Sequence, residues 1–320
     1  MIKEVWYDNF LDAIGKKYPK KTQLVQALMD LLFIEREAVY RRLRKSVLFS
    51  MSEVIKIAAT WKISLDEVTG LNKEHISFQM HQLNYLDPSE KELNFLRSIV
   101  QSISYLRHFP DTEFMDICNK LSRQFFAGFP HLNQFYLFKW MHQYGVDSET
   151  IPYSKTIISE EKLKLTAEYY QAIKHVPNSN FILDKRLFDY LINDIRYFHS
   201  IYLITDEEKE RIKNDLYNLL DYLLEVANKG CYPETQNRVN LYVSQLNIDT
   251  NYSYTFTPEA KICYIHVFEK YEIYTLNPEM VANFRTWMQL KKRTSIKISE
   301  VDEKTRIEFF SKQRQLVDGL

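Results

Sequence analysis

The spacing of apolar residues changes along this chain of 320 residues, and that change constrains the fold more than any single motif does. Up to about residue 230, apolar residues recur every three or four positions, which is typical of amphipathic helices. From Tyr232 onward they alternate with polar residues, as in half-buried strands, and turn residues separate the alternating runs. The sequence therefore predicts a mainly α protein with a C-terminal α+β domain that contains a small antiparallel sheet.

The first 72 residues are predicted to form five short helices with tight connections. We expect these helices over residues 5–16, 22–32 and 35–45, and from Ser50 and Ser64 onward. Ser50 and Ser64 each stand three residues before a glutamate, which is the spacing of a capping box at a helix start. Boundaries at about residues 72 and 230 then give a five-helix domain (1–72), a helical domain (73–230) and an α+β domain (231–320).

Composition excludes several classes of enzyme and cofactor site. The six glycines all lie more than ten residues apart, so the chain lacks the clustered glycines of phosphate-binding loops. The three cysteines and eight histidines show no spacing typical of a zinc site. We expect a protein that is not an enzyme and that binds no cofactor or metal. An enzyme that uses the α+β domain is a weaker alternative, for which no nucleophile, base or metal ligand can be named.

Charge is balanced over the whole chain, with 42 Lys and Arg against 42 Asp and Glu, but it is unevenly distributed. Residues 1–72 hold 12 basic and 9 acidic residues, a net charge of +3, and the remainder carries −3. The basic residues gather in two runs, which are Lys16, Lys17, Lys20 and Lys21, and then Arg36, Arg41, Arg42, Arg44 and Lys45. A basic face on a neutral protein can bind a polyanion, because its field extends over a Debye length of roughly 8–10 Å.

Two of the expected helices, 22–32 and 35–45, are joined by about three residues. Two helices joined in this way can form a helix-turn-helix, whose second helix enters the DNA major groove. At about 100° per residue, Leu43 lies about 40° from Val39, so both side chains should face the core. The opposite side of the helix, at about 100–200° from Val39, holds Glu37, Tyr40, Arg41 and Arg44.

These outward residues have the donors and acceptors that base recognition requires. Arginine offers a fork of donors to guanine, glutamate can accept from cytosine, and Tyr40 can contact a thymine methyl group or a phosphate. Arg42, Lys45, Lys20 and Lys21 are expected to contact phosphates, which fix the register without reading sequence. The candidate DNA-binding residues are Lys20, Lys21, Arg36, Glu37, Tyr40, Arg41, Arg42, Arg44 and Lys45. The simpler alternative is a solvated basic helix packed on a small bundle.

Residues 22–71 resemble a phage-repressor-like (lambda repressor-like) helix-turn-helix domain, chiefly through VYRRLR at 39–44 and ISLDE at 63–67. The whole chain resembles a group of bacterial transcriptional regulators common in Bacteroidetes, through FPHLNQFYLFKW at 129–140 and RIEFFSKQRQLVD at 306–318. Two features depart from the repressor pattern. Phe33 replaces the small turn residue of many repressors, and Lys45 and Ser46 stand where a glycine usually follows the second helix.

Together these observations predict a sequence-specific, DNA-binding transcriptional regulator that is cytoplasmic and acts as a homodimer on double-stranded DNA. The longest uncharged stretch, 124–138, is too short and too polar to span a membrane, so no membrane partner is expected. Residues 73–320 would serve oligomerisation, the sensing of a small-molecule effector, or contact with a protein partner. The alternative function is a non-enzymatic protein-interaction adaptor that keeps a repressor-like helical domain without touching DNA.

Tyrosines recur in the alternating C-terminal segment and leave two interpretations open. The residues concerned are Tyr252, Tyr254, Tyr264, Tyr271 and Tyr274. They could line a ligand pocket, because tyrosine presents an apolar body with a polar tip. They could equally pair across strands as ordinary packing residues.

Overall fold

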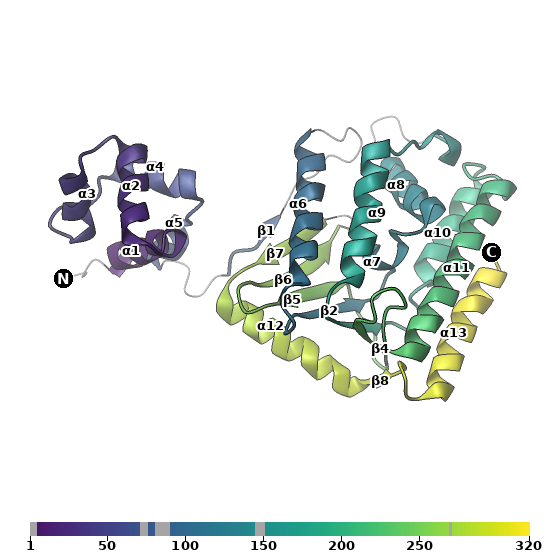
Figure 1. Cartoon of the computed structure of the whole chain (residues 1–320). Coiled ribbons are helices and arrows are strands. Elements are labelled where there is room, and N and C mark those ends of the chain that lie inside the picture. Colours follow the sequence, from purple (N-terminus) through teal and green to yellow (C-terminus); the bar gives the residue numbers. More distant parts are fainter. Residues whose placement is uncertain (1–4, 71–75, 81–89, 145–150, 269–270) are drawn as a thin grey trace. The chain divides into compact units, whose positions relative to one another are not determined.

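The chain divides after Ser77 into two units, Met1–Ser77 and Phe78–Leu320. The computed structural model describes residues 5–70, 76–80, 90–144, 151–268 and 271–320, and each unit is considered by itself (Figure 1). The division lies close to the boundary expected near residue 72. Residues 71–75, which contain that position, lie outside the described residues.

The first unit contains the five helices that the sequence predicts. They are α1 (Val5–Lys17), α2 (Lys21–Leu32), α3 (Arg36–Leu43), α4 (Met51–Trp61) and α5 (Leu65–Thr69). The capping box at α4 is confirmed, because Ser50 accepts from the backbone of Glu53 while the Glu53 side chain accepts from the backbone of Ser50. One apolar cluster joins the helices, with Tyr7, Phe10, Leu28 and Ile57 at its centre.

The second unit is built on a mixed sheet, which has eight strands among the described residues in the order β1-β7-β6-β5-β2-β3-β4-β8. Its strands are β1 (Gln79–Met80), β2 (Glu113–Cys118), β3 (Asn178–Leu183), β4 (Arg238–Ser244), β5 (Tyr252–Phe256), β6 (Lys261–Val267), β7 (Tyr271–Thr275) and β8 (Ser295–Lys297). The neighbours β2, β3 and β4 run parallel, and the other pairs are antiparallel.

The expected small antiparallel sheet is therefore wrong in size and in direction, although β5, β6 and β7 do form the predicted antiparallel meander. The sequence pattern missed β2 and β3, which lie at the centre of the sheet. Both are buried on their two faces along most of their length, so neither shows the alternation of a half-buried strand. A short buried strand of this kind cannot be told from a buried helix by periodicity.

The domain boundary expected near residue 230 is also wrong. Strand β3, which precedes it, pairs along its whole length with β4, which follows it, from Asn178↔Arg238 to Leu183↔Val243. The residues on either side of position 230 consequently belong to one sheet and one unit. Gly230 itself ends α11 (Asp206–Lys229) with a φ of 67°, a left-handed conformation that suits glycine.

Helices cover both faces of the sheet (Figure 1). On one face, α12 (Pro278–Lys291) packs Phe284 and Met288 against Met115, Ile117 and Tyr254. A larger cluster on the other face joins Phe181, Leu183 and Leu241 to helices α8 (Pro130–Tyr144), α10 (Asp189–Ser200), α11 and α13 (Glu303–Asp318). The remaining helices are α6 (Glu90–Leu106), α7 (Arg123–Phe126) and α9 (Glu160–Lys174), with short 3-10 turns at Tyr153–Lys155 and Lys292–Thr294.

The five tyrosines of the C-terminal segment do not share one face of this sheet. Tyr252 packs on Phe284 and Trp287 of α12, with ring centroids 6.0 and 4.9 Å apart. Tyr264 and Tyr274 are register partners whose rings lie 5.9 Å apart on the opposite face. Cross-strand and helix packing thus accounts for these three residues. No described helix is long and apolar enough to cross a membrane.

Candidate nucleic-acid interface

The connection between α2 and α3 is a tight turn centred on Phe33. This residue ends α2 in the left-handed region, with φ 56° and ψ 45°, and its backbone N–H donates to the carbonyl of Met29 at 2.9 Å. Glu35 is then the N-cap of α3, so only three residues separate the two helices. A left-handed conformation is sterically unfavourable for a residue with a Cβ, which explains why many repressors have a small residue here. The protein makes the same turn with phenylalanine.

The inner face of α3 is the one that the helical angles predict. Val39 is fully buried in the cluster of the first unit, and Leu43 packs against that cluster while partly exposed. The end of α3 is held by Tyr7 of α1, whose hydroxyl donates to the carbonyl of Arg42 at 3.1 Å and accepts from the backbone N–H of Phe49 at 3.1 Å. Packing and hydrogen bonds therefore fix the rotation of α3 about its axis.

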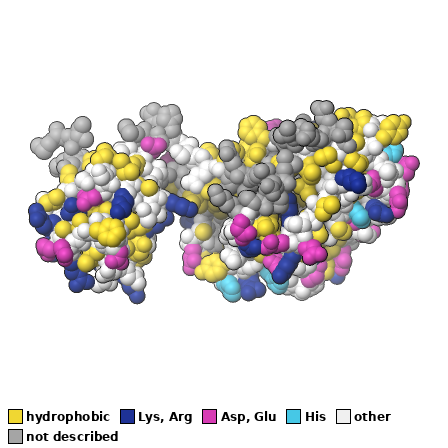
Figure 2. Space-filling model, turned by 90° about the horizontal axis from the view of Figure 1, so that it is seen from above, with side chains coloured by type: hydrophobic (Ala, Val, Ile, Leu, Met, Phe, Trp, Pro, Cys, Tyr) yellow, Lys and Arg dark blue, Asp and Glu magenta, His cyan; other side chains and the backbone are white. Residues whose placement is uncertain are grey.

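The outer face of α3 presents the predicted polar set to solvent. Arg36, Glu37, Arg41 and Arg44 are exposed. Within the described part of the chain, none of the three arginines forms an ion pair. Figure 2 shows that Lys and Arg side chains lie at the surface of the first unit, interspersed with acidic and apolar ones. The guanidinium groups on this face are consequently positioned to bind an external anion.

Tyr40 links this face to the start of α2. Its half-buried ring has the ammonium of Lys21 at 5.8 Å from the ring centroid and the guanidinium of Arg44 at 5.4 Å. Both distances are within the range of cation–π attraction, which is about 0.5–1 kcal/mol at exposed sites. The structure thus brings together Lys21, Tyr40 and Arg44, three residues that are up to 23 positions apart in the sequence.

The start of α2 is basic and has no side-chain cap. Lys20 is its N-cap residue, and no side chain accepts a hydrogen bond there. Lys20 and Lys21 are both exposed. Positive side chains at a helix start are unfavourable for the helix dipole, whereas an anion bound there is stabilised by the dipole and by the free N–H groups. This end of α2 is suited to a phosphate.

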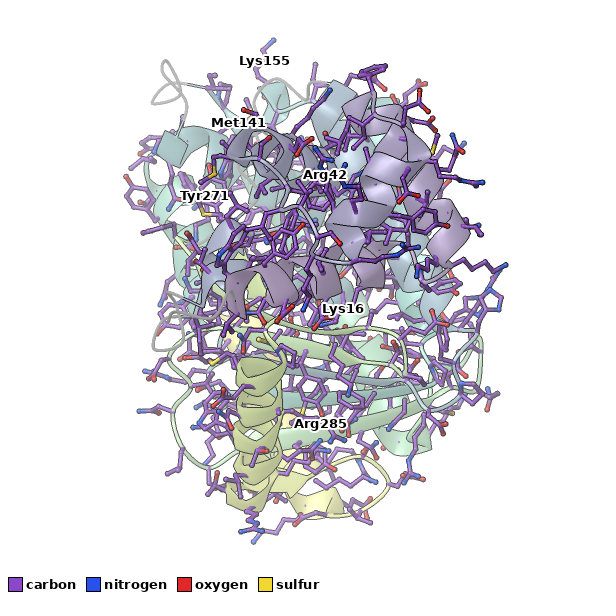
Figure 3. All side chains as sticks on the ribbon, turned by 90° about the vertical axis from the view of Figure 1, so that its left-hand side faces the viewer. Lys16, Arg42, Met141, Lys155, Tyr271 and Arg285 are labelled. Carbon is purple, nitrogen blue, oxygen red and sulfur yellow. The ribbon has the colours of Figure 1, made fainter. Side chains whose placement is uncertain are left out.

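Arg42 does not belong to the exposed face. Its guanidinium donates to both carboxylate oxygens of Glu53, from Nη2 at 2.7 Å and from Nε at 3.1 Å, and to the carbonyl of Ala38 at 3.1 Å. The two side chains are only 18% and 17% exposed. Burial alone would raise the pKa of Glu53, but the hydrogen bonds from Arg42 and Ser50 lower it. The pair ties α3 to α4, and Figure 3 shows Arg42 among the helices of the first unit.

This geometry does not favour the phosphate contact that the sequence predicts for Arg42. The helical angles contained the signal, because Arg42 lies about 60° from Val39, on the inner side of α3. Its partner was harder to identify, since Glu53 could be assigned to the capping box alone. Lys45 follows α3 with a φ of 63° and is paired with Asp8 of α1; both side chains are about half exposed. Lys45 therefore needs only to exchange a surface carboxylate for a phosphate.

No metal cluster is present among the residues that the structure describes. Comparison of the chain with family models, with curated proteins and with solved structures found no match in any of the three. The interpretation of this surface consequently depends on its own geometry and charge.

Proposed function

We propose that the protein is a sequence-specific transcriptional regulator that binds double-stranded DNA through α2 and α3. The observation that carries this proposal is the outer face of α3, where Arg36, Arg41 and Arg44 are exposed and make no ion pair among the described residues. The eight residues of α3 span about 12 Å, which matches the roughly 12 Å width of the major groove. The proposal agrees with the resemblance to repressor-like regulators.

Each residue of the surface has a distinct part in this proposal. Arg41 and Glu37, one turn apart on the outer face, read base edges, Arg41 at a guanine and Glu37 at a cytosine. Lys20 and Lys21 hold a phosphate at the start of α2, and Arg36, Arg44 and Lys45 neutralise further phosphates along the groove. Tyr40 keeps Lys21 and Arg44 close together. Arg42 has a structural part only.

A cytoplasmic homodimer would place two such surfaces on successive turns of DNA, with half-sites about 10 bp apart. The second unit, Phe78–Leu320, is far larger than DNA docking requires. It would supply the dimer contact, a sensor for a small-molecule effector, or a site for a protein partner.

Titration of a labelled duplex over a range of salt concentrations tests the electrostatic part of this proposal. About four phosphate contacts per protomer give a log–log slope of affinity against salt of roughly −4. Arg211→Ala, which removes a paired arginine from α11 of the second unit, is the matched control and should leave the slope unchanged. Absence of binding to a genomic fragment library at low salt would exclude the proposal.

A protein-interaction adaptor is the second candidate, because the first unit also exposes large apolar side chains. Phe33 is 85% exposed, Met51 72% and Ile55 52%. Such residues are usual at protein contacts when they are contiguous. Capture of a partner that survives Arg41→Ala together with Arg44→Ala, in a protein without DNA affinity, would favour this function over DNA binding.

A further inference from the structure

An open depression lies on the second unit, where three loops converge. The loops follow α6, α9 and α11 and lead into the parallel strands β2, β3 and β4, so they meet at the amino ends of neighbouring strands. The depression has a volume of about 450 Å³, which is within the usual range of roughly 300–1,000 Å³ for small-molecule sites. Its wall includes Arg107, His108, His175, Glu234 and Asn237.

One wall of the depression is rigid because a single backbone carbonyl organises it. The carbonyl of Lys174 accepts from the hydroxyl of Thr235 at 2.6 Å and from the amide of Asn237 at 3.0 Å. The Lys174 side chain is only 4% exposed and donates to Glu234 at 2.6 Å. Its ammonium also lies 4.0 Å from the ring centroid of Tyr170. A site wall built on a buried lysine changes little in shape when a ligand arrives.

The same contacts cancel the negative charge of the wall. Glu234 is the one carboxylate that lines the depression, and both its oxygens are engaged, one by Lys174 and the other by the hydroxyl of Tyr222 at 3.1 Å. Burial alone would raise the pKa of Glu234, but the bond from Lys174 lowers it, so the carboxylate is charged and paired.

The groups left facing the depression are cationic or can become so. Arg107 is exposed and forms no ion pair within the described residues, and its Nε donates to Nε2 of His108 at 3.5 Å. His175, the C-cap residue of α9, supplies a second exposed imidazole. An arginine fork with two imidazoles is a donor set for a carboxylate or a phosphate group.

We propose that this depression binds the oxyanion group, phosphate or carboxylate, of a small molecule. The volume exceeds that of a bare oxyanion, so the remainder of the ligand lies against Pro177 and Asn237. The proposal does not depend on DNA binding by the first unit, since the two units carry separate residues. If the protein is a regulator, the ligand is its effector.

The test is titration of the full-length protein, without DNA, with inorganic phosphate at constant ionic strength, following the imidazole signals by NMR. The signals of His108 and His175 should move together and saturate, with a Kd of roughly 1 mM or below. His199, which is paired with Asp206 on the surface, should not move. A parallel titration with acetate shows whether the carboxylate group is also accepted, and chloride is the control anion.

Two variants decide the outcome. Arg107→Ala should weaken binding about tenfold or more, His175→Gln should weaken it while leaving the His108 signal in place, and Arg211→Ala should change nothing. All three positions are exposed, so none should prevent folding. Shifts of His108 and His175 that occur equally with chloride, or that persist unchanged in Arg107→Ala, would overturn the proposal.

Discussion

Replacement of Arg42 should destabilise the first unit, whereas replacement of its neighbour Arg41 should not. Arg42→Met removes two hydrogen bonds to Glu53 and one to the carbonyl of Ala38. Hydrogen bonds to a charged group contribute roughly 1.5–3 kcal/mol, and breaking a fully buried ion pair costs about 3–5 kcal/mol. Since both partners keep slightly under a fifth of their exposure, and methionine retains the apolar stem, we expect a loss of about 2 kcal/mol.

Native-state hydrogen exchange of the full chain measures this change where it occurs. The amides of Val54 and Ile57 in α4 lie in the core of the first unit and report its opening. Arg42→Met should lower the free energy of opening at these amides by about 2 kcal/mol, and Arg41→Met by less than about 0.5 kcal/mol. A double-mutant cycle with Glu53→Gln separates the pair from other effects of each substitution.

The same pair gives a pH dependence of known sign. The pKa of Glu53 is lower in the folded protein than its usual value of 4.5, so its contribution to stability is complete above that value. The contribution is lost as the pH falls through the folded-state pKa. The coupling energy between Arg42 and Glu53 should therefore disappear on acidification. Equal effects of Arg41→Met and Arg42→Met, or a coupling energy near zero at neutral pH, would refute this assignment.

Three further perturbations follow from the structure. Burial raises the pKa of Asp116 to about 7, so the folded second unit binds a proton that the unfolded chain releases above pH 3.8, and its stability should fall as the pH rises toward 7; thermal unfolding of Asp116→Asn should lack this slope. A Cβ at Gly128 would lie 2.4 Å from the Tyr170 ring, so Gly128→Ala should cost about 1–3 kcal/mol in denaturant unfolding. Lys62 caps α4 with a φ of 52°, so Lys62→Gly should slow exchange in α4 by about 1 kcal/mol, and no gain there would contradict the strain.

Local features of the first unit were predictable because their causes lie close together in the sequence. The rotation of α3 follows from Val39 and Leu43 on one face, and the start of α4 follows from the spacing of Ser50 and Glu53. The turn at Phe33 was placed correctly between the helices, although its left-handed backbone could not be inferred from a phenylalanine.

Features that depend on distant residues were not predictable. The central strands β2 and β3 are recognisable as strands only through their pairing with each other and with β4, which begins 60 residues after β3 does. Arg42 was assigned to phosphate because it stands in a basic run, and its pairing with Glu53 requires the fold of α3 against α4. The depression at Arg107, His108 and His175 unites loops that are 67 residues apart in the chain, and no local motif marks it.

Selection of bound duplexes from a random library, with full-length protein and with the variants Arg41→Ala and Lys21→Ala, tests the central claim most directly. The account predicts one enriched motif for the wild type. Arg41→Ala should lose preference at one base pair, by about 1–3 kcal/mol, and Lys21→Ala should weaken all sequences alike and reduce the salt slope by about 1. Failure to enrich any sequence, or a motif and affinity that Arg41→Ala leaves unchanged, would contradict it.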